Sequence, residues 1–342
     1  MIRVQPFPQS YDRGPWRGIE RLAEVTDLRI AFVSSTRAGL DPLAGMTHAF
    51  DVAERLGADL IVQLGDAMPG YADDAGLESQ WAELDAILAA VSTPWIRVAG
   101  NHDISDARAR EVWEARVGAA AYALRVGEVL FLVLDAQDGA TLDADGYLQS
   151  TIDALPAGAR ARLEPWLSSG LDAEGIRRLL REAPEDGEVL LAALSSAKAA
   201  RGGDAVFSDE QTAWAEGILD EHRDAAWTFV LMHQPGWVGA GAPGFGRILE
   251  ALGQRPATVF SGHVIHAHTE HRGQLALAAL GYTDPAVAGT RFGRRERRDL
   301  LTWARMTREG AVLTNILLDE ILDLDQQRVF TTAQWPDPEQ SV

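Results

Sequence analysis

Short apolar runs, each bounded by turn-forming residues, recur along the chain and predict β-strands. These runs lie at 28–34, 59–65, 94–100, 128–135, 227–233 and 257–263. Between them, segments 46–57 and 77–91 place apolar residues at spacings of three and four, which is the pattern of amphipathic helices. Strands and helices therefore alternate in the first part of the chain. This order predicts an α/β fold in which helices cover a sheet that includes parallel strand pairs.

The alternation stops between residues 140 and 207, where alanine, glycine, leucine and arginine dominate. Short helical patterns in this stretch predict a helical insertion near one end of the sheet. Such an insertion could be a lid over a site or an elaboration of the packing. Residues 208–222 then resume the earlier pattern as an amphipathic helix, with Ser208 or Asp209 as its N-cap.

The composition is that of a globular protein, with 46% hydrophobic and 24% charged residues. No apolar run approaches the roughly 18 to 20 residues that a membrane span needs, so we expect no membrane partner. The first residues lack the apolar segment of a secretory signal, and we therefore expect a cytoplasmic protein. Because the chain has no cysteine, metal ligands must come from histidine, aspartate, glutamate and asparagine.

The net charge of −19 makes nucleic acid an unlikely partner, because an acidic chain repels phosphates. One local exception is the stretch 291–308, which contains seven arginines. We expect a helix there, either solvated and paired with acidic neighbours or forming a patch for an anionic ligand.

Polar residues follow four of the predicted strands, at the point where each strand ends. In α/β proteins the carboxyl ends of strands are where catalytic and binding groups gather. Each of these segments is weak alone, since an Asp after Gly is commonly a turn and a His after a strand is commonly a core residue. Their order along the chain is more informative: Asp66, then Asn101, His102 and Asp103, then His233, then His263, His266 and His268.

In this order the sequence resembles the calcineurin-like metallophosphoesterases, whose pattern is D-x-H, G-D, G-N-H-[DE], a lone H and G-H-x-H. The resemblance covers about residues 28–103 and 208–268. It implies an α/β four-layer α-β-β-α sandwich of two mixed sheets, and hydrolysis of a phosphate ester at metal ions. We expect one domain over 1–342, with the helical insertion at 140–207 inside it. Residues 272–342 would complete the second sheet and end in a tail.

The resemblance also implies roles for single residues. Asp66 would be the bridging ligand, and Asn101, His233 and His263 would complete one metal position. His102 would protonate the leaving group or stabilise the transition state, with Asp103 as its orienting partner.

The ligands of the other metal position are missing together. Ser35 and Arg37 stand where the family has the Asp and His of D-x-H, and Ile265 stands where it has the last His of G-H-x-H. This pattern predicts one divalent transition metal, Mn, Fe or Zn, with a second metal doubtful. Arg37 could lend its charge to a bound phosphate, or it could be a solvent-facing arginine of the turn. Alternatively, His266 or His268 could replace the missing histidine.

Three functions remain open at this point. The first is a metal-dependent phosphatase or phosphodiesterase with a reduced, mononuclear site that acts on a small phosphorylated substrate. The second is an inactive descendant that binds a phosphorylated ligand or a protein partner. The third is a single-metal enzyme of different chemistry. The sequence does not determine the substrate or the oligomeric state.

Overall fold

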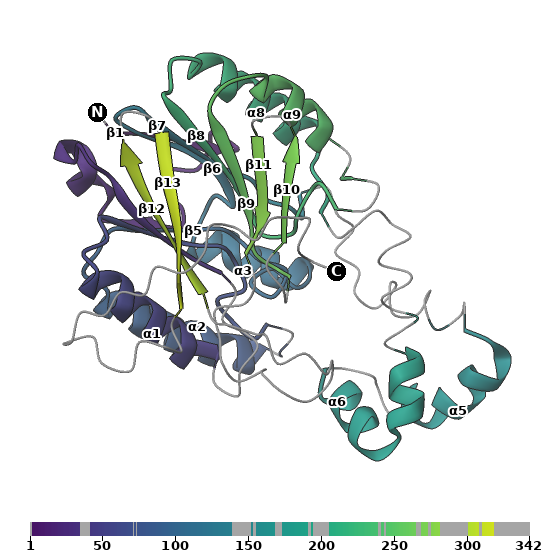
Figure 1. Ribbon diagram of the computed structural model, residues 1–342. Helices are drawn as coiled ribbons and strands as arrows, with labels where there is room; N and C mark the ends of the chain where they lie inside the picture. The colour runs from purple at the N-terminus through teal and green to yellow at the C-terminus, as the bar shows by residue number, and fades with distance from the viewer. Residues whose placement is uncertain are drawn as a thin grey trace.

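The computed structural model describes most of the chain. The described residues are 2–34, 42–70, 72, 74–138, 152, 155–167, 173–190, 193, 205–238, 241, 242, 244–264, 268–272, 275–280, 300–307 and 310–317. They form two mixed β-sheets that pack face to face, with helices on the outer faces (Figure 1).

The larger sheet has seven strands, in which β7, β8, β9 and β11 run parallel and the outer pairs are antiparallel. Its spatial order is β1 Ile2–Phe7, β6 Ala121–Val126, β7 Val129–Val133, β8 Trp227–Met232, β9 Ala257–Ser261, β11 Leu275–Ala279 and β10 His268–Arg272.

The smaller sheet has six strands, and its parallel part is β3, β4 and β5. Its spatial order is β13 Gly310–Leu317, β12 Leu300–Thr307, β3 Arg29–Val33, β4 Leu60–Gln63, β5 Trp95–Arg97 and β2 Trp16–Arg17. The four strands expected to precede polar ligands are thus divided between the sheets, with β4 and β5 in one and β8 and β9 in the other.

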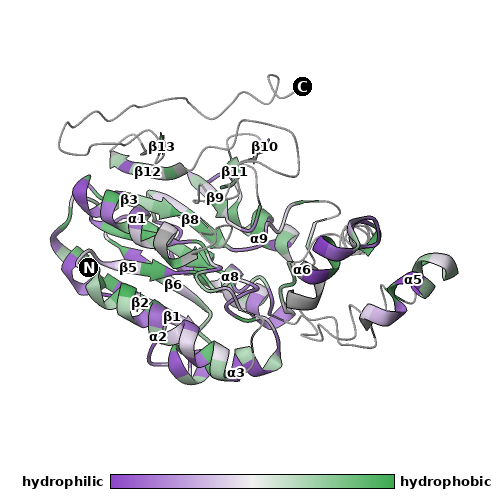
Figure 2. Ribbon diagram, turned by 90° about the horizontal axis from the view of Figure 1, so that it is seen from below, coloured by the Kyte–Doolittle hydropathy of each residue, from purple (hydrophilic) through white to green (hydrophobic). Residues whose placement is uncertain are grey.

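Helices cover the outer face of each sheet and turn their polar sides outward (Figure 2). Buried residues of α1, α2 and α3 pack on the six-stranded sheet, and those of α8 and α9 pack on the seven-stranded sheet. The helices are η1 Ile19–Glu24, α1 Pro42–Arg55, α2 Asp74–Ala90, α3 Ala107–Arg116, α5 Ala157–Leu167, α6 Ala173–Glu182, α8 Asp209–Glu221 and α9 Phe245–Leu252. The expected N-cap of α8 is confirmed, because the Ser208 hydroxyl accepts a hydrogen bond from the amide of Gln211.

Apolar side chains from both sheets fill the space between them and form the central core. Its middle is aromatic: Phe32 of β3 lies 4.6 Å from Phe260 of β9 and 5.3 Å from Phe229 of β8, measured between ring centroids. With the helical layers outside, this gives the four-layer sandwich that the sequence predicts. The core fixes the distance between the two sheets, and therefore between the loops that follow β4, β5, β8 and β9.

The C-terminal part of the chain contributes to both sheets, which differs from our expectation that it completes only one. β11 extends the seven-stranded sheet beside β9, whereas β12 pairs with β3 in the six-stranded sheet. The helix expected over 291–308 is also wrong for residues 300–307, which form β12. There Leu301, Ala304 and Met306 are buried while Arg305 is exposed, so the strand places its arginine at the surface.

Between residues 152 and 193, the described part of the 140–207 segment is mainly helical and has a small apolar core of its own, whereas Val206 bridges to Gln137 of the main body. Leu163 of α5 and Leu179 of α6 are fully buried in it, together with Ile152 and Leu190. In Figure 1 these helices lie apart from the two sheets, at the lower right. Among the described helices, none is long and apolar enough to cross a membrane.

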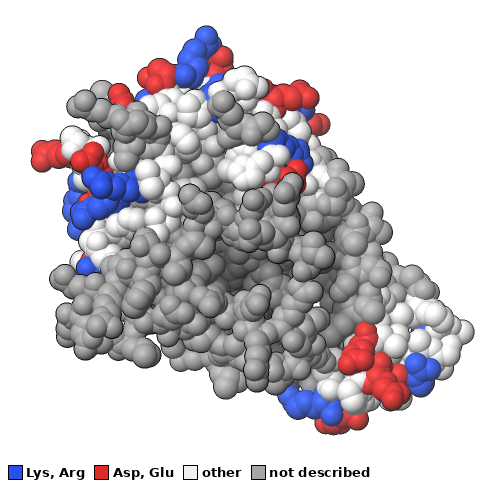
Figure 3. All heavy atoms as spheres, in the orientation of Figure 1, with Lys and Arg blue, Asp and Glu red and all other residues white. Residues whose placement is uncertain are grey.

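Arginines on the described surface lie beside acidic side chains (Figure 3). Arg116, for example, pairs with both Glu78 and Asp85, and Arg247 pairs with Glu216. Pairing of this kind neutralises the arginines locally and leaves the excess of acidic residues to set the net charge.

Candidate metal centre

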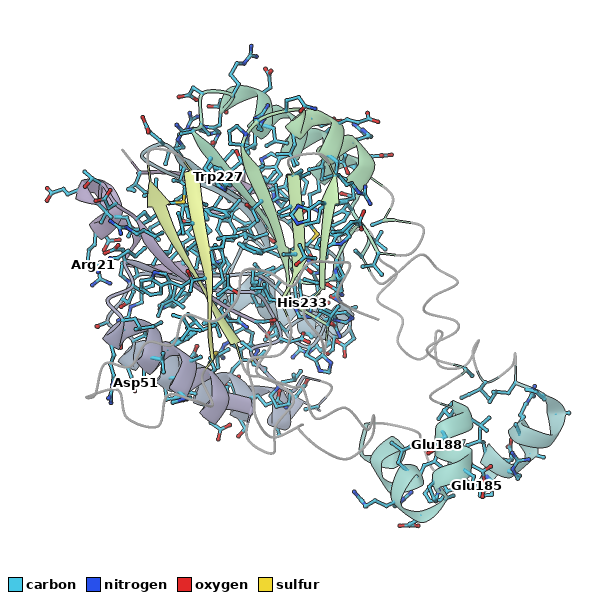
Figure 4. The ribbon with its side chains drawn as sticks, in the orientation of Figure 1. Arg21, Asp51, Glu185, Glu188, Trp227 and His233 are labelled. Atoms are coloured by element: carbon cyan, nitrogen blue, oxygen red, sulfur yellow. The ribbon has the colours of Figure 1, made fainter. Side chains whose placement is uncertain are left out.

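The residues predicted as ligands come together at one edge of the sandwich, where β4, β5, β8 and β9 end. Asp66 lies three residues beyond β4, and Asn101 lies four beyond β5. His233 directly follows β8, and His263 lies two residues beyond β9. Figure 4 shows His233 where the strands of both sheets end. The site therefore spans the interface between the two sheets, and each sheet supplies part of it.

Three of these side chains form a compact cluster. Asp66, His233 and His263 each offer one ligand atom, and the three atoms lie within 4.8 Å of one another. Nε2 of His233 is 3.1 Å from Oδ2 of Asp66 and 3.3 Å from Nδ1 of His263. Asp66 is 1% exposed and His233 fully buried, so water cannot screen these groups. Within the described residues, this is the group of histidine and acidic side chains that could hold a metal ion.

The backbone fixes which nitrogen of His233 faces Asp66. Nδ1 of His233 lies 2.7 Å from the carbonyl oxygen of Leu64, and because a carbonyl can only accept, Nδ1 carries the proton. The neutral ring then presents an acceptor, Nε2, to a carboxylate. The lone pair of Nε2 and the negative Oδ2 of Asp66 repel each other. A proton or a metal cation between these two atoms removes that repulsion. Without a metal, burial alone would lower the pKa of His233, but the Asp66 carboxylate, the Leu64 carbonyl and Asp103 together outweigh it and raise the pKa.

The backbone is held in an unfavourable conformation at two of the three residues of the cluster. Asp66 has φ 55° and His263 has φ 67°, and these are the non-glycine residues with positive φ in the described chain. Such conformations cost roughly 1–3 kcal/mol each and persist where the surrounding structure enforces them. That both belong to the cluster indicates that the fold maintains the ligand geometry at a cost in stability.

Asp103 connects the loop after β4 with the loop after β5. Its carboxylate accepts hydrogen bonds from the amides of Asp66 at 2.9 Å, Ala67 at 3.1 Å and Gly100 at 2.9 Å. Burial raises the pKa of Asp103, and the nearby Arg97 guanidinium, 3.9 Å away, opposes the shift. All of these recorded hydrogen bonds go to the backbone, so the role of Asp103 as orienting partner of His102 stays a prediction.

His102 lies beside the cluster and is oriented by backbone groups. Its amide donates to Oδ1 of Asp66 at 2.9 Å, and its Nδ1 lies 2.5 Å from the carbonyl oxygen of Pro69. Nδ1 therefore carries the ring proton, and Nε2 is the atom that can take up or release a further proton. This arrangement suits the predicted role of His102 in proton transfer.

The remaining predicted residues have different outcomes. Asn101 stands between Gly100 and His102, both of which contact Asp66 or its loop, and it stays a predicted ligand. Ser35, Arg37 and His266 lie outside the described residues. His268 begins β10, where its backbone pairs with Ala279, and its role as a replacement ligand stays a prediction.

Two contributors to the site were missed in the sequence. The carbonyl of Leu64 has no sequence signal, because any residue supplies a carbonyl. Arg97 did have a sequence signal, because it is a charged residue inside the apolar run 94–100. In the structure its side chain is 2% exposed. A charge within a buried strand requires a buried partner.

Comparison with solved structures supports the fold. A dimetal phosphatase from Danio rerio superposes with a TM-score of 0.58 and 12% identity, covering 85% of this chain and 96% of that one. A purple acid phosphatase from yellow lupin gives a TM-score of 0.49 and 10% identity, and the superposition covers 87% of this chain and 52% of that one. At 12% identity, the likeness to the Danio rerio structure concerns the fold alone. The comparison with curated proteins finds no match.

The sequence itself matches the model of the calcineurin-like phosphoesterase family over residues 23–267. This range contains the loops after β4, β5 and β8 and the loop with His263. The chain therefore belongs to the calcineurin-like phosphoesterase family.

Proposed function

We propose that this protein is a metal-dependent phosphoester hydrolase with one divalent transition metal, held by Asp66, His233 and His263 together with Asn101. The observation that supports this most directly is the cluster itself: one ligand atom from each of Asp66, His233 and His263 lies within 4.8 Å of the others, and His263 is partly exposed.

The residues present fit a metal of the Mn, Fe or Zn type. Imidazole nitrogens and a carboxylate are ligands that these ions accept, and the bond from His233 to the Leu64 carbonyl is the usual outer contact of a ligating histidine. The hydrogen bonds that hold the Asp66 loop are already formed in the protein. Binding would therefore need little rearrangement of the chain.

When bound, such a metal activates water as a nucleophile and stabilises charge on the phosphoryl oxygens. The chain supplies the other functions. Asp66, His233 and His263 orient the site, and the fold excludes bulk water from the first two. His102, with Nδ1 committed to Pro69, can hold at Nε2 the proton that the leaving group needs.

The proposal is tested with small phosphorylated model substrates, p-nitrophenyl phosphate and bis(p-nitrophenyl) phosphate. We expect hydrolysis that chelator abolishes and Mn²⁺ or Zn²⁺ restores. The variant His263→Ala should lose this metal-dependent hydrolysis. His271→Ala is the matched control, because His271 is an exposed histidine in β10. Equal activity with and without chelator would contradict the metal-dependent mechanism.

If the protein binds metal and releases no product from either ester, the hydrolase proposal is wrong. The remaining interpretation is then a non-hydrolytic member of the family that binds a phosphorylated ligand or a protein partner.

A further inference from the structure

A charged side chain that the proposed chemistry does not use lies beneath the metal centre. Arg97 belongs to β5, and its side chain is 2% exposed. Its Nε and Nη2 are buried and make no hydrogen bond in the described structure. Burying a guanidinium without hydrogen bonds is costly, so its retention requires a specific interaction.

Two neighbouring indole rings lie beside this guanidinium. Its Cζ lies 5.4 Å from the ring centroid of Trp113 in α3 and 6.0 Å from that of Trp81 in α2. Aromatic faces attract a cation and do not compete for a carboxylate. The rings therefore leave the charge of Arg97 to be balanced by acidic side chains, and one described carboxylate forms an ion pair with it.

That group is Asp103. The nearest nitrogen of Arg97, Nη2, lies 3.9 Å from Oδ1 of Asp103, whose side chain is fully buried. Asp103 in turn accepts from the amides of Asp66, Ala67 and Gly100, which belong to the two loops that support the cluster. A chain of contacts thus runs from Arg97 through Asp103 to the backbone of the ligand Asp66.

We infer that Arg97 is a positioning residue for the proposed metal centre: its buried guanidinium orients the carboxylate of Asp103, which acts as a brace by holding the backbone amides around Asp66. The inference rests on the proposed function, since it assigns Arg97 a role in preparing that same site. Outer contacts of this kind change metal affinity by about 10- to 100-fold when removed.

The test compares four variants with a matched control. Arg97→Met removes the charge but keeps an apolar chain beside the two indoles, and Arg97→Lys keeps the charge. Asp103→Asn removes the brace, alone or combined with Arg97→Met. Arg255→Met is the control, because Arg255 donates to the carbonyls of Leu219, Ala251 and Leu252 and lies before β9, at the opposite edge of the sheet.

Two quantities are measured: Mn²⁺ affinity by titration calorimetry, and amide hydrogen exchange in the metal-free protein. In Arg97→Met we expect the amides of Asp66, Ala67 and Gly100 to exchange faster relative to amides of β8, and Mn²⁺ to bind about 10- to 100-fold more weakly. Arg97→Lys should recover most of this affinity. Arg255→Met should lower stability and leave Mn²⁺ affinity within about twofold of the wild type.

If Arg97→Met does not fold, the combined variant still decides the question. It removes both the guanidinium of Arg97 and the carboxylate of Asp103, so neither charge is left buried without its partner. Arg97→Met/Asp103→Asn should bind Mn²⁺ as weakly as Asp103→Asn and no more weakly. A further loss in the combined variant would overturn the inference, as would wild-type exchange and affinity in a folded Arg97→Met. If the wild type binds no metal, the proposed function fails, while the exchange measurement still decides the role of Arg97.

Discussion

The close approach of Gly100 to Asp66 allows the geometry of the proposed metal centre to be disturbed without replacing a proposed ligand. A Cβ added at Gly100 would lie 2.2 Å from the amide nitrogen of Asp66 and 2.4 Å from its Oδ1. Both distances are far inside van der Waals contact, and the nitrogen belongs to the backbone, so the Asp66 loop must move. Overpacking of this kind costs about 1–3 kcal/mol.

We therefore expect Gly100→Ala to lower the free energy of unfolding by about 1–3 kcal/mol in urea titrations with chelator present. Mn²⁺ affinity should fall at least about tenfold, because a shift of the Asp66 loop also breaks its hydrogen bonds to Asp103.

Gly217→Ala is the matched control. Gly217 lies inside α8, and a Cβ there would meet no atom within 4 Å. The change should stabilise the protein by about 0.5–1 kcal/mol, because alanine favours the helix, and should leave Mn²⁺ affinity unchanged. If Gly100→Ala is as stable as the wild type and binds Mn²⁺ as tightly, the close packing around Asp66 does not determine the site.

Three further outcomes follow from individual side chains. His102→Ala should lower kcat by about 10²- to 10⁴-fold on an alkyl phosphoester while metal content, measured by elemental mass spectrometry, stays the same. Partial burial alone would raise the pKa of Glu54, but hydrogen bonds from Ser92 and Thr93 lower it. Glu54→Gln should therefore cost about 1 kcal/mol at neutral pH, and chemical denaturation should show this difference vanishing as pH falls through the lowered pKa. Phe229→Ala, in the aromatic middle of the core, should cost about 3–5 kcal/mol of unfolding free energy by urea titration, and a loss below 1 kcal/mol would contradict the packing described.

The layers of the fold were predictable because the parallel strands are short apolar runs next to amphipathic helices. The runs around β3, β4, β5, β7, β8 and β9 were all found. β1 and β6 were missed, since β1 contains Arg3, Gln5 and Pro6, and β6 contains Arg125 near its end. β1 is held by long-range pairing with β6, and local sequence carries little of that information. β6 also forms a local hairpin with β7.

β12 shows why the arginine-rich stretch misled the prediction. Seven arginines over 291–308 suggested one helical face, yet residues 300–307 form β12, in which Leu301, Thr302, Ala304 and Met306 are buried and Arg305 is exposed. Pairing with β3 decides the outcome, because it buries Leu301 and Ala304 between layers that are distant in sequence. The number of arginines in a segment does not distinguish a helix from a strand.

At the site, sequence order predicted which side chains gather, and the structure brings Asp66, His233 and His263 together. What the sequence could not provide is the backbone: the Leu64 carbonyl that sets the His233 ring, and the amides that Asp103 holds. Such contacts depend on the distance between two sheets, which arises only from the packing of the whole core.

The most direct test of the account is the metal content per chain, measured by elemental mass spectrometry on protein purified without added metal or chelator. The account predicts about one transition metal per chain in the wild type and in His271→Ala, and its loss in His233→Ala. No metal in the wild type, even after soaking in Mn²⁺ or Zn²⁺, would contradict the proposed centre. Two metals per chain would contradict a single-metal site and direct attention to His266 and His268.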